Sequence, residues 1–399
     1  MHILMIAPEP FFEPRGTPFS EFHRIRALTA LGHTVDLVTY PFGRNVEMPG
    51  LRVHRCVRPP FISHIGIGPS WKKLPLDISL ALSALKLALT RRYDAVHSHE
   101  EGGAIGVLLA KALHVPHLYD MHSSLPQQIT NFGYGRSRWL IRLFGWVERV
   151  MVRNSRVVIV ICPELETTVR QVNARVPTVL IENAPGSGEA PRAGTGLTIR
   201  ASLGLTADTP VILYTGTFEA YQGLDLLYGA MREVARERPD ARLVMVGGEA
   251  AQVDAARATI RALGLETTVI FTGQRPFEDV PAYLDAADVL ASPRSTGTNT
   301  PLKIYQYLRS GRPIVATRLL THTQVLSDET AFLAEPTTSA FAAAILEALR
   351  DPAAAGAIGE RARSLAESKY SDAAYMAKTH AAMSLLGGPV REEVAGGLA

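Results

Sequence analysis

Short apolar runs alternate with helical patterns along almost the whole chain, and this alternation limits the choice of fold more than any other feature. The runs lie at residues 2–7, 34–40, 95–99, 116–122 and 157–162, and again at 210–216, 241–248, 268–273, 289–293 and 313–317. A strand that is apolar on both faces suits a parallel sheet, whose neighbouring strands are joined by covering helices. The sequence therefore predicts an α/β protein built on parallel sheets.

One segment without periodicity divides the chain. Residues 184–196, APGSGEAPRAGTG, are rich in Gly, Ala and Pro, which is typical of a linker. A length of 399 residues also suits two domains. We therefore expect two doubly wound, Rossmann-like domains, at residues 1–185 and 197–370. Two such domains facing each other would leave a cleft lined by the carboxyl ends of both sheets, where ligands of this fold class bind.

Composition and the chain start narrow the class of protein. A net charge of +3 is too small to suggest a nucleic-acid-binding protein. Cys56 and Cys162 form no CxxC or metal spacing, which fits a reducing compartment. The start MHILMIAPEP lacks the basic region of a signal peptide, and the apolar stretch 74–89 is too short to span a bilayer. We expect a cytoplasmic protein, soluble or peripheral to the inner face of the plasma membrane.

The loop after the first strand has the composition of an anion or sugar site. Gly16 permits close approach of a ligand, Thr17 can cap the following helix, and Pro18 suits its first turn. A helix N-terminus of this kind attracts negatively charged groups. The loop is not a GxGxxG sequence, so a dinucleotide cofactor gains no support.

Histidines end two neighbouring strands of the first domain. His97 and His99 close one strand together with Glu100, and His122 follows the next in the sequence DMHSS. A histidine at the carboxyl end of a parallel strand can donate a hydrogen bond to a substrate oxygen. His122 is the stronger candidate, because it leads directly into a Gly- and Gln-containing loop.

Three loops of the second domain carry candidate phosphate contacts. Residues 216–223, GTFEAYQG, join a strand to a helix, and their glycines free backbone N–H groups to face a phosphate. Arg294 ends a later strand, and Lys303 lies in the first turn of a helix expected to start at Pro301 and to end near Gly311. Two cations beside a helix N-terminus would bind a diphosphate.

A basic amphipathic helix is expected at residues 136–156. Four arginines fall on one stripe, namely Arg138, Arg142, Arg149 and Arg153, and Arg156 continues it. The segment's large apolar residues, Trp139 and Leu143 among them, are expected on the opposite face, towards the domain core. The arginine stripe suggests contact with an anionic membrane surface, aided by Trp71 and the lysines after it.

Together, these motifs resemble the family 4 glycosyltransferases of the GT-B fold. The resemblance lies in RGTPFSEFHRIRALTALGHTVDLVTY, YDMHSS, GTFEAYQGLDLL, VGG and SPR…PLKIYQYLRSGRPIVAT, whose order and spacing match up to about residue 350. It implies a GT-B architecture, with the C-terminal helix at 371–399 packing back on the first domain. It also implies retaining transfer of a sugar from a UDP- or GDP-linked donor to a lipid-linked or saccharide acceptor, without a required metal or other cofactor.

The resemblance assigns roles by position. Gly16 would approach the donor phosphates or the reacting sugar, and His122 would contact the transferred sugar and stabilise developing charge. Arg294 and Lys303 would hold the diphosphate and make it a better leaving group. Further donor contacts are expected from Gly216, Thr217, Tyr221, Gln222, Gly247, Gln274, Arg275, Thr298, Asn299, Thr300, Pro301, Leu302 and Gln306, with Gln274 and Arg275 beside the base. Acceptor contacts are expected from Arg15, Thr17, His99 and Ser123.

The chain departs from the family pattern at four donor positions. Relatives usually place two glutamates eight residues apart in the signature, and here these positions hold Thr298 and Gln306. An Arg and a Lys usual in the loop after the first donor-domain strand are replaced by Thr217 and Gln222. We therefore expect a divergent branch whose cationic clamp consists of Arg294 and Lys303, with Gln306 still able to bind a ribose hydroxyl.

Two alternatives stay open. A nucleotide-sugar epimerase of similar build would need carboxylate acid–base groups, for which His99, Glu100 and Glu101 are the nearest cluster. A non-catalytic sugar-nucleotide-binding subunit of a transferase complex would explain the missing glutamates.

Overall fold

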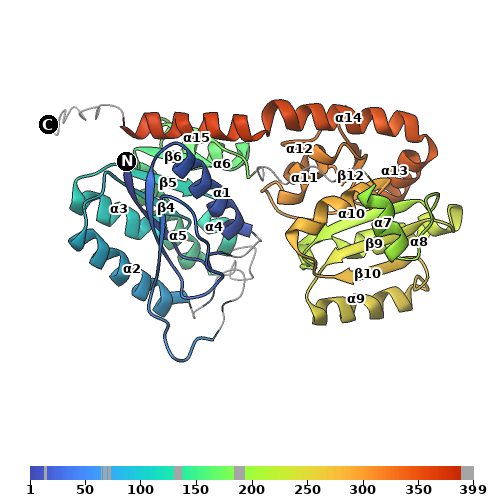
Figure 1. The fold of residues 1–399 in the computed structure, drawn as a ribbon, viewed down its shortest axis with the longest axis horizontal. Helices are drawn as coiled ribbons and strands as arrows, with labels where there is room; N and C mark the ends of the chain where they lie inside the picture. Colours follow the sequence, from blue (N-terminus) through green and yellow to red (C-terminus); the bar gives the residue numbers. More distant parts are fainter. Residues whose placement is uncertain are drawn as a thin grey trace. The chain divides into compact units, whose positions relative to one another are not determined.

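The computed structural model describes residues 1–12, 16–63, 65, 70, 73–129, 137–183 and 194–387. The chain divides into two compact units, and the chain's last helix returns to the first of them (Figure 1). The first unit contains Met1–Glu182 and Tyr375–Ala399, and the second contains Asn183–Ala374. Each unit is described by itself below.

The first unit is built on a seven-stranded parallel sheet with the order β3-β2-β1-β4-β5-β6-β7. Its strands are β1 (His2–Ala7), β2 (Thr34–Thr39), β3 (Leu51–Arg55), β4 (Ala95–His99), β5 (His117–Met121), β6 (Val157–Val160) and β7 (Thr178–Leu180). The order reverses between β1 and β4, which makes the carboxyl ends of these two strands the switch point where ligands of such sheets bind.

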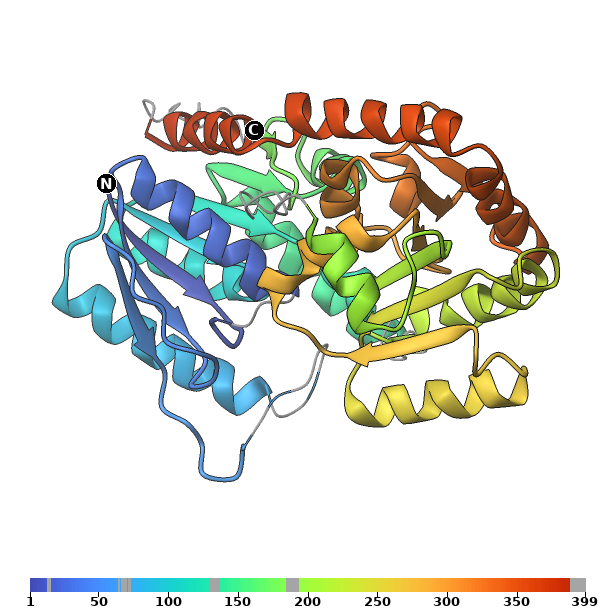
Figure 2. The same cartoon turned by 45° about the vertical axis from the view of Figure 1, so that its right-hand side comes forward.

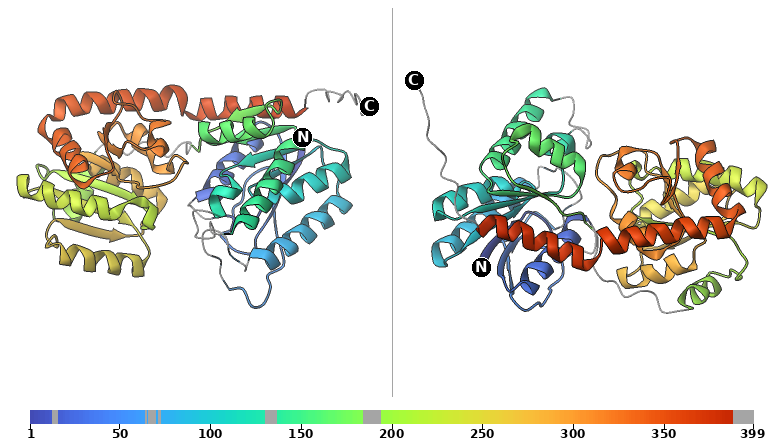
Figure 3. Two further views of the ribbon diagram at one scale, coloured as in Figure 1. Left: turned by 180° about the vertical axis from the view of Figure 1, so that it is seen from behind. Right: turned by 90° about the horizontal axis from the view of Figure 1, so that it is seen from above.

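Helices cover both faces of the first sheet. They are α1 (Gly16–Ala30), α2 (Lys73–Thr90), α3 (Gly102–Leu113), α4 (Leu125–Ile129), α5 (Arg138–Arg153), α6 (Pro163–Val172) and α15 (Asp372–Gly387). On one face, α1 and α15 pack against β1 and β2 through residues such as Ile25, Leu28 and Met383. On the other face α2, α3 and α5 form a contiguous layer, visible from behind in the left panel of Figure 3.

The second unit repeats the design with a six-stranded parallel sheet of order β10-β9-β8-β11-β12-β13. Its strands are β8 (Val211–Gly216), β9 (Arg242–Gly247), β10 (Val269–Gly273), β11 (Val289–Ser292), β12 (Ile314–Thr317) and β13 (Phe332–Ala334). Its switch point lies between β8 and β11.

The helices of the second unit also form two layers. They are α7 (Thr195–Ser202), α8 (Leu224–Glu237), α9 (Ala250–Ala262), α10 (Val280–Ala286), α11 (Leu302–Ser310), α12 (Leu320–Thr323), α13 (Thr338–Arg350) and α14 (Pro352–Lys369). Helices α8, α9 and α13 pack on one face of the sheet, and Figure 2 shows α9 in yellow beside β10. Helices α7, α10, α11 and α14 pack on the other.

The two sheets confirm the predicted doubly wound α/β design, and the differences from the sequence prediction are local. β3, β7 and β13 were not predicted, because each is short or half-exposed and gives little apolar signal. Residues 184–193 of the expected linker lie outside the described residues, and Thr195 already begins α7. Thr17 lies inside α1, which begins at Gly16, so Thr17 is not the expected cap.

The predicted core face of α5 is wrong in part. Trp139 and Leu143 are exposed, as is Trp146, and they border the arginine stripe instead of lying opposite it. Phe144, Val147 and Met151 do pack into the core. The helix therefore turns a mixed basic and apolar surface towards solvent.

Candidate active site

Strand alternation places four functional side chains on one face of the first sheet. His97 and His99 are two residues apart on β4. Asp120 lies on β5, and His122, two residues later, directly follows that strand. Alternate residues of a strand point the same way, and β4 pairs with β5 so that His99 lies opposite Asp120. All four face α1 and α15, at the edge where the sheet order reverses.

These side chains form a buried polar network. Arg24 of α1 donates from Nε to Oδ2 of Asp120 at 2.9 Å, and both side chains are buried. His122 Nε2 lies 3.3 Å from Asp120 Oδ1, and a hydrogen bond of 3.1 Å joins it to His99 Nδ1. His97 Nε2 lies 3.6 Å from Asp120 Oδ2, with its ring stacked on that of His99. Asp120 is therefore the centre of the network.

The charges of the network follow from its burial and its partners. Burial of Asp120 is outweighed by the positive charge of Arg24 and by the nearby side chain of His97, and the pKa of its carboxyl group falls well below the usual value. Burial lowers the pKa of His97, His99 and His122, which outweighs the attraction of Asp120. The favoured state is one carboxylate and one guanidinium surrounded by neutral imidazoles.

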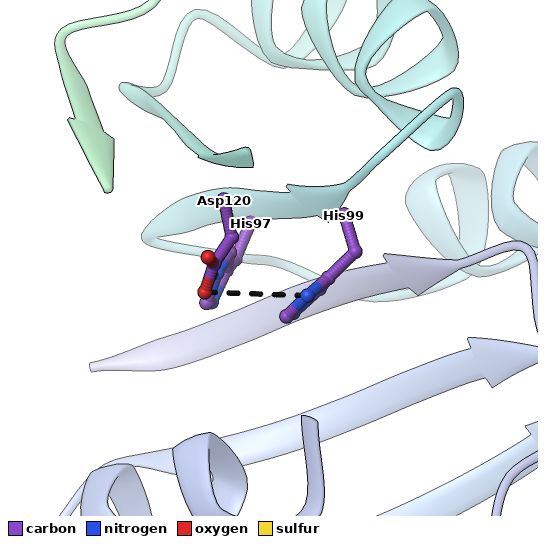
Figure 4. A group of neighbouring side chains, drawn as sticks. All are labelled: His97, His99 and Asp120. Atoms are coloured by element: carbon purple, nitrogen blue, oxygen red, sulfur yellow. Dashed lines mark ion pairs between the residues drawn. The ribbon is translucent and has the colours of Figure 1, made fainter. Parts of the chain in front are cut away.

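The ligand atoms of His97, His99 and Asp120 lie within 4.8 Å of one another, close enough to hold a metal ion (Figure 4). A metal would have to share Asp120 with the Arg24 guanidinium at 2.9 Å, which already supplies the positive charge that this carboxylate attracts. We therefore interpret the cluster as a hydrogen-bonding network, and the sequence-based expectation that no metal is required stays a prediction.

Acidic side chains gather near the same edge. Glu9 follows β1 and lies near Glu21 of α1, whose pKa rises to about 8 through burial and the nearby charge of Asp120. Glu100 accepts hydrogen bonds from Ser123 at 3.0 Å and from Gln128 at 3.1 Å, and burial raises its pKa well above the usual value. The Glu9 and Glu21 pair was missed in the sequence, because nothing in the pattern shows that the two residues meet.

Gly16 and the predicted acceptor residues of the first unit lie in different surroundings. Gly16 begins α1 in a left-handed conformation with φ of 58°, and no atom of the described residues would lie within 4 Å of a Cβ at this position. Ser123 is bonded to Glu100, and His99 lies fully buried within the network. Arg15 lies outside the described residues.

In the second unit the start of α11 holds a buried amine. Pro301 is the N-cap of α11, and Lys303 in the first turn is 7% exposed. Its Nζ has no hydrogen-bond partner among the described residues and lies 3.8 Å from the centre of the Tyr214 ring. Burial and the nearby charge of Arg294 lower the pKa of Lys303 well below its usual value. A buried amine of this kind at a helix N-terminus favours an anionic ligand.

Arg294 follows β11 and shapes its own loop. Its Nε donates to the Thr296 carbonyl oxygen at 2.9 Å and its Nη1 to that of Asn299 at 3.1 Å, while the guanidinium lies over the Tyr221 ring. Gly297 has a φ of 110°, which favours glycine, and a Cβ there would lie 2.6 Å from Arg294 Nη2, so a larger residue would displace this guanidinium. Arg294 therefore holds the loop, a role that the sequence did not predict.

The loop after β8 lies beside the amine of Lys303. A Cβ on Gly216 would lie 3.5 Å from Lys303 Nζ, so the bare backbone of Gly216 borders the amine. Gln222 donates to Thr217 Oγ1 at 3.4 Å, and the Tyr221 carbonyl accepts from the backbone N–H of Ser295. Gly247 of β9 packs on Gly216, where a Cβ would lie 2.0 Å from the Gly216 oxygen. The switch point between β8 and β11 thus brings these predicted residues together.

For the other predicted donor residues, the described contacts include none with the amine of Lys303. Gln274 and Arg275 follow β10, at the edge of the sheet, and both are exposed. The Thr298 carbonyl accepts from Gln324 and the Asn299 carbonyl from Thr321, so these residues hold the loop through their backbone. Thr300 is buried, and its hydroxyl has no hydrogen-bond partner among the described residues. Leu302 and Gln306 lie half-buried on α11.

Sequence reasoning missed the residues that support the site. No motif in the sequence singles out Arg24, and only the fold places it on Asp120. His322 of α12 bonds Ser292 at 2.8 Å and Thr317 at 3.0 Å, and Thr317 in turn donates to the Arg294 carbonyl at 2.6 Å. The alternation of Asp120 and His122 was the one available signal, since it places both on the same face.

Comparison with protein families supports the assignment of both units. Residues 23–184 match the family described as "Glycosyl transferase 4-like domain", and residues 209–351 match "Glycosyl transferases group 1". The chain is 30% identical over 316 residues to a D-inositol 3-phosphate glycosyltransferase of Corynebacterium diphtheriae, covering 74% of this chain and 71% of the relative.

Solved structures share the fold. A sucrose-phosphate synthase from Thermosynechococcus elongatus matches with a TM-score of 0.79 at 23% identity, over 96% of this chain and 98% of that one. Anabaena HepE in complex with UDP matches with a TM-score of 0.74 at 18% identity, over 96% of this chain and 100% of that one. Both likenesses concern the fold.

Proposed function

Because the chain belongs to the family 4 glycosyltransferases of the GT-B fold and is a glycosyltransferase enzyme, we propose that it transfers a sugar, with retention, from a nucleoside diphosphate sugar. The proposed acceptor is lipid-linked or a saccharide, in glycolipid or cell-surface polysaccharide synthesis. The observation that carries the proposal is the buried amine of Lys303 at the start of α11.

The second unit supports a diphosphate contact at Lys303. The amine is buried beside a helix N-terminus and the bare backbone of Gly216, and no carboxylate is present in the first turn of α11. A diphosphate would restore the favourable charge that burial removes from the amine. UDP bound to the structurally similar HepE supports a uridine nucleotide as the first donor to test.

The first unit supports a role in handling the sugar. We propose that His122 contacts the transferred sugar and that Gly16 leaves room for a ligand at the N-terminus of α1. In the proposed transfer the leaving diphosphate would take the acceptor's proton as its bond to the sugar breaks, so the chain would need to hold that diphosphate firmly.

Thermal-shift screening with nucleotides and nucleotide sugars is the first test, since a ligand that binds the native state raises its unfolding temperature. We expect a UDP- or GDP-sugar to raise the melting temperature and to be hydrolysed slowly without an acceptor. Epimerised donor without hydrolysis would favour the epimerase alternative. Binding without any turnover would favour a non-catalytic subunit, and no binding to any nucleotide would contradict the proposal.

We also propose that the outward surface of α2, α3 and α5 contacts an anionic bilayer, which suits a lipid-linked acceptor. Among the described residues, this surface carries nine exposed large apolar side chains: Leu74, Ile78, Leu82, Leu85, Leu89, Leu108, Trp139, Leu143 and Trp146. The same helices expose Arg138, Arg142, Arg149 and Arg153, and their two acidic residues, Asp77 and Glu148, are not exposed. Basic and aromatic residues together favour a bilayer interface.

Vesicle binding tests this surface. The wild-type protein should sediment with phosphatidylglycerol vesicles, and the emission of its tryptophans should shift to the blue, because Trp139 and Trp146 enter the interface. Alanine at Arg138, Arg142 and Arg149 should weaken binding about 100-fold, at about 1 kcal/mol per charge. Alanine at the exposed Arg232, Arg236 and Arg261 of the second unit is the control, and equal loss in both variants would contradict the proposal.

In the described part of the chain, no helix has both the length and the apolarity needed to cross a membrane.

A further inference from the structure

A chain of buried contacts leads from the C-terminal helix to His122. On α15, the Thr379 hydroxyl accepts a hydrogen bond of 3.3 Å from Arg24 Nη1, and the Tyr375 ring lies 5.1 Å from the same guanidinium. Arg24 Nε bonds Asp120 Oδ2, and Asp120 Oδ1 faces His122 Nε2. Arg24, Asp120 and Thr379 are each at most 1% exposed. Residues from opposite ends of the chain therefore surround one carboxylate.

We infer that Arg24 and Asp120 are positioning residues that hold His122 in the tautomer with its proton on Nε2, and that α15 completes this device. In this tautomer the lone pair is on His122 Nδ1, so towards a sugar hydroxyl that atom would accept a hydrogen bond instead of donating one. The part that concerns the sugar rests on the proposed function, whereas the tautomer and the role of α15 follow from the first unit alone.

The position of Asp120 decides between the two tautomers. One proton lies between His99 Nδ1 and His122 Nε2, which are 3.1 Å apart, and either ring could carry it. Asp120 Oδ1 is 3.3 Å from His122 Nε2, whereas Asp120 Oδ2 is 4.0 Å from His99 Nδ1. A carboxylate attracts the proton to the nearer nitrogen, and an unprotonated nitrogen facing it at 3.3 Å would be repelled. The proton therefore belongs on His122 Nε2.

Arg24 fixes which carboxylate oxygen faces the histidine. Its Nε occupies Oδ2 at 2.9 Å, which leaves Oδ1 turned to His122. Because Thr379 gives its own proton to the Tyr375 carbonyl at 2.9 Å, a lone pair of its hydroxyl remains to accept from Arg24. Without the Thr379 hydroxyl, the Arg24 guanidinium loses one of the hydrogen bonds that fix its orientation. We then expect the Asp120 carboxylate to rotate more freely.

The matched variants are Thr379→Val, which keeps the side-chain shape but cannot accept the bond, and Thr379→Ser, which keeps the hydroxyl. Ser384→Ala is the control on the same helix, because Ser384 is exposed and bonds only the His380 carbonyl among the contacts described. Long-range proton–nitrogen NMR spectra of 15N-labelled protein report the tautomer of each histidine, with His122→Gln used to assign the His122 signals.

We expect wild-type His122 to show a neutral ring with the proton on Nε2, and the Ser384→Ala and Thr379→Ser spectra to be the same. Thr379→Val should give a mixture of tautomers. With a donor that turns over, its kcat should fall about tenfold while KM for the donor stays within about twofold, because orientation and not binding is lost. A merely structural role for Thr379 would lower stability without changing the tautomer.

Two results would overturn the inference: a His122 proton on Nδ1 in the wild type, or an unchanged tautomer and kcat in folded Thr379→Val. The NMR arm needs no substrate, so it still decides the inference if no donor is found. The absence of donor binding and turnover in the wild type contradicts the proposed function alone.

Discussion

Lys303 is the residue whose surroundings most directly indicate a ligand. Its amine is buried at the start of α11 with no hydrogen-bond partner among the described residues, and its lowered pKa makes the neutral form easier to reach. A bound diphosphate would raise this pKa again, because it stabilises the charged amine. Binding on the alkaline side of neutrality should therefore take up a proton.

Calorimetry in buffers of different ionisation enthalpy measures this uptake. We expect Lys303→Met to abolish it and to weaken nucleotide binding about 10- to 100-fold, the loss of one charge-assisted hydrogen bond of about 1.5–3 kcal/mol. Lys369→Met, an exposed lysine at the end of α14, should change neither quantity. Proton uptake that persists in Lys303→Met would assign it to another group.

Asp36 of β2 is expected to control the acid stability of the first unit. Its buried carboxylate accepts from Arg91 at 2.7 Å and Tyr93 at 2.9 Å and pairs with His2 and His54. These hydrogen bonds, above all that from Arg91, outweigh burial and lower the pKa of Asp36 to about 2. Since the folded pKa lies below the ordinary one, the contribution is complete above about pH 4 and is lost as the pH falls through about 2.

Asp36→Asn should destabilise the first unit by about 2 kcal/mol at pH 7, the value of a shift of nearly two pKa units. All three tryptophans of the chain lie in this unit, at positions 71, 139 and 146, so urea unfolding followed by tryptophan fluorescence reports on it. The difference from wild type should shrink between about pH 4 and pH 2. A difference that stays constant over this range, or that equals the effect of the exposed Asp208→Asn, would contradict the assignment.

At the scale of elements, the packing of α14 on α11 depends on one glycine. A Cβ on Gly359 of α14 would lie 2.0 Å from the carbonyl oxygen of Gly311, which ends α11 in a left-handed conformation. A Cβ on Gly356, one turn earlier in the same helix, would meet no atom of the described residues within 4 Å. The two positions therefore separate helix propensity from helix packing.

Gly359→Ala should lower the stability of the second unit by about 1–3 kcal/mol, because the helices must move apart. Gly356→Ala should raise it by about 0.5–1 kcal/mol, since alanine favours a helix interior. Calorimetric unfolding of both variants measures the second unit, which contains no tryptophan. Equal effects of the two substitutions would show that the contact between α11 and α14 adapts without cost.

At the scale of the whole molecule, the last helix belongs to the unit that contains the first residue. Ala382, Met383 and Leu386 of α15 are buried in the same core as Ile3 and Met5 of β1. The double variant Met383→Ala, Leu386→Ala should therefore destabilise the tryptophan-containing first unit by several kcal/mol, at about 2–5 kcal/mol for each buried side chain. Nucleotide binding to the second unit should persist.

Leu385→Ala, whose side chain is 43% exposed on the same helix, is the matched control and should have little effect. The prediction would be contradicted if the double variant lowered only the calorimetric transition of the second unit and left the tryptophan fluorescence unchanged. That result would show that α15 stabilises the second unit instead of the first.

Particular residues show how far the sequence went. Gly216, Thr217, Tyr221, Gln222, Arg294 and Lys303 could be predicted together, because loops after adjacent parallel strands meet at one edge of a sheet. No pattern in the sequence indicates that Arg294 bonds the carbonyls of its own loop. Trp139 and Leu143 were assigned to the core because helical periodicity shows which residues share a face, but not which face meets the rest of the protein.

The sequence by itself determined the alternation of strands and helices, and with it two parallel doubly wound sheets and the loops that carry candidate ligand contacts. These features are local, since periodicity, Gly and Pro decide them within a few residues. Only the tertiary structure decided that Arg24 and Thr379 meet at Asp120, that Glu9 meets Glu21, and that the Lys303 amine is buried. Such contacts depend on packing between distant segments, and no single stretch of sequence contains them.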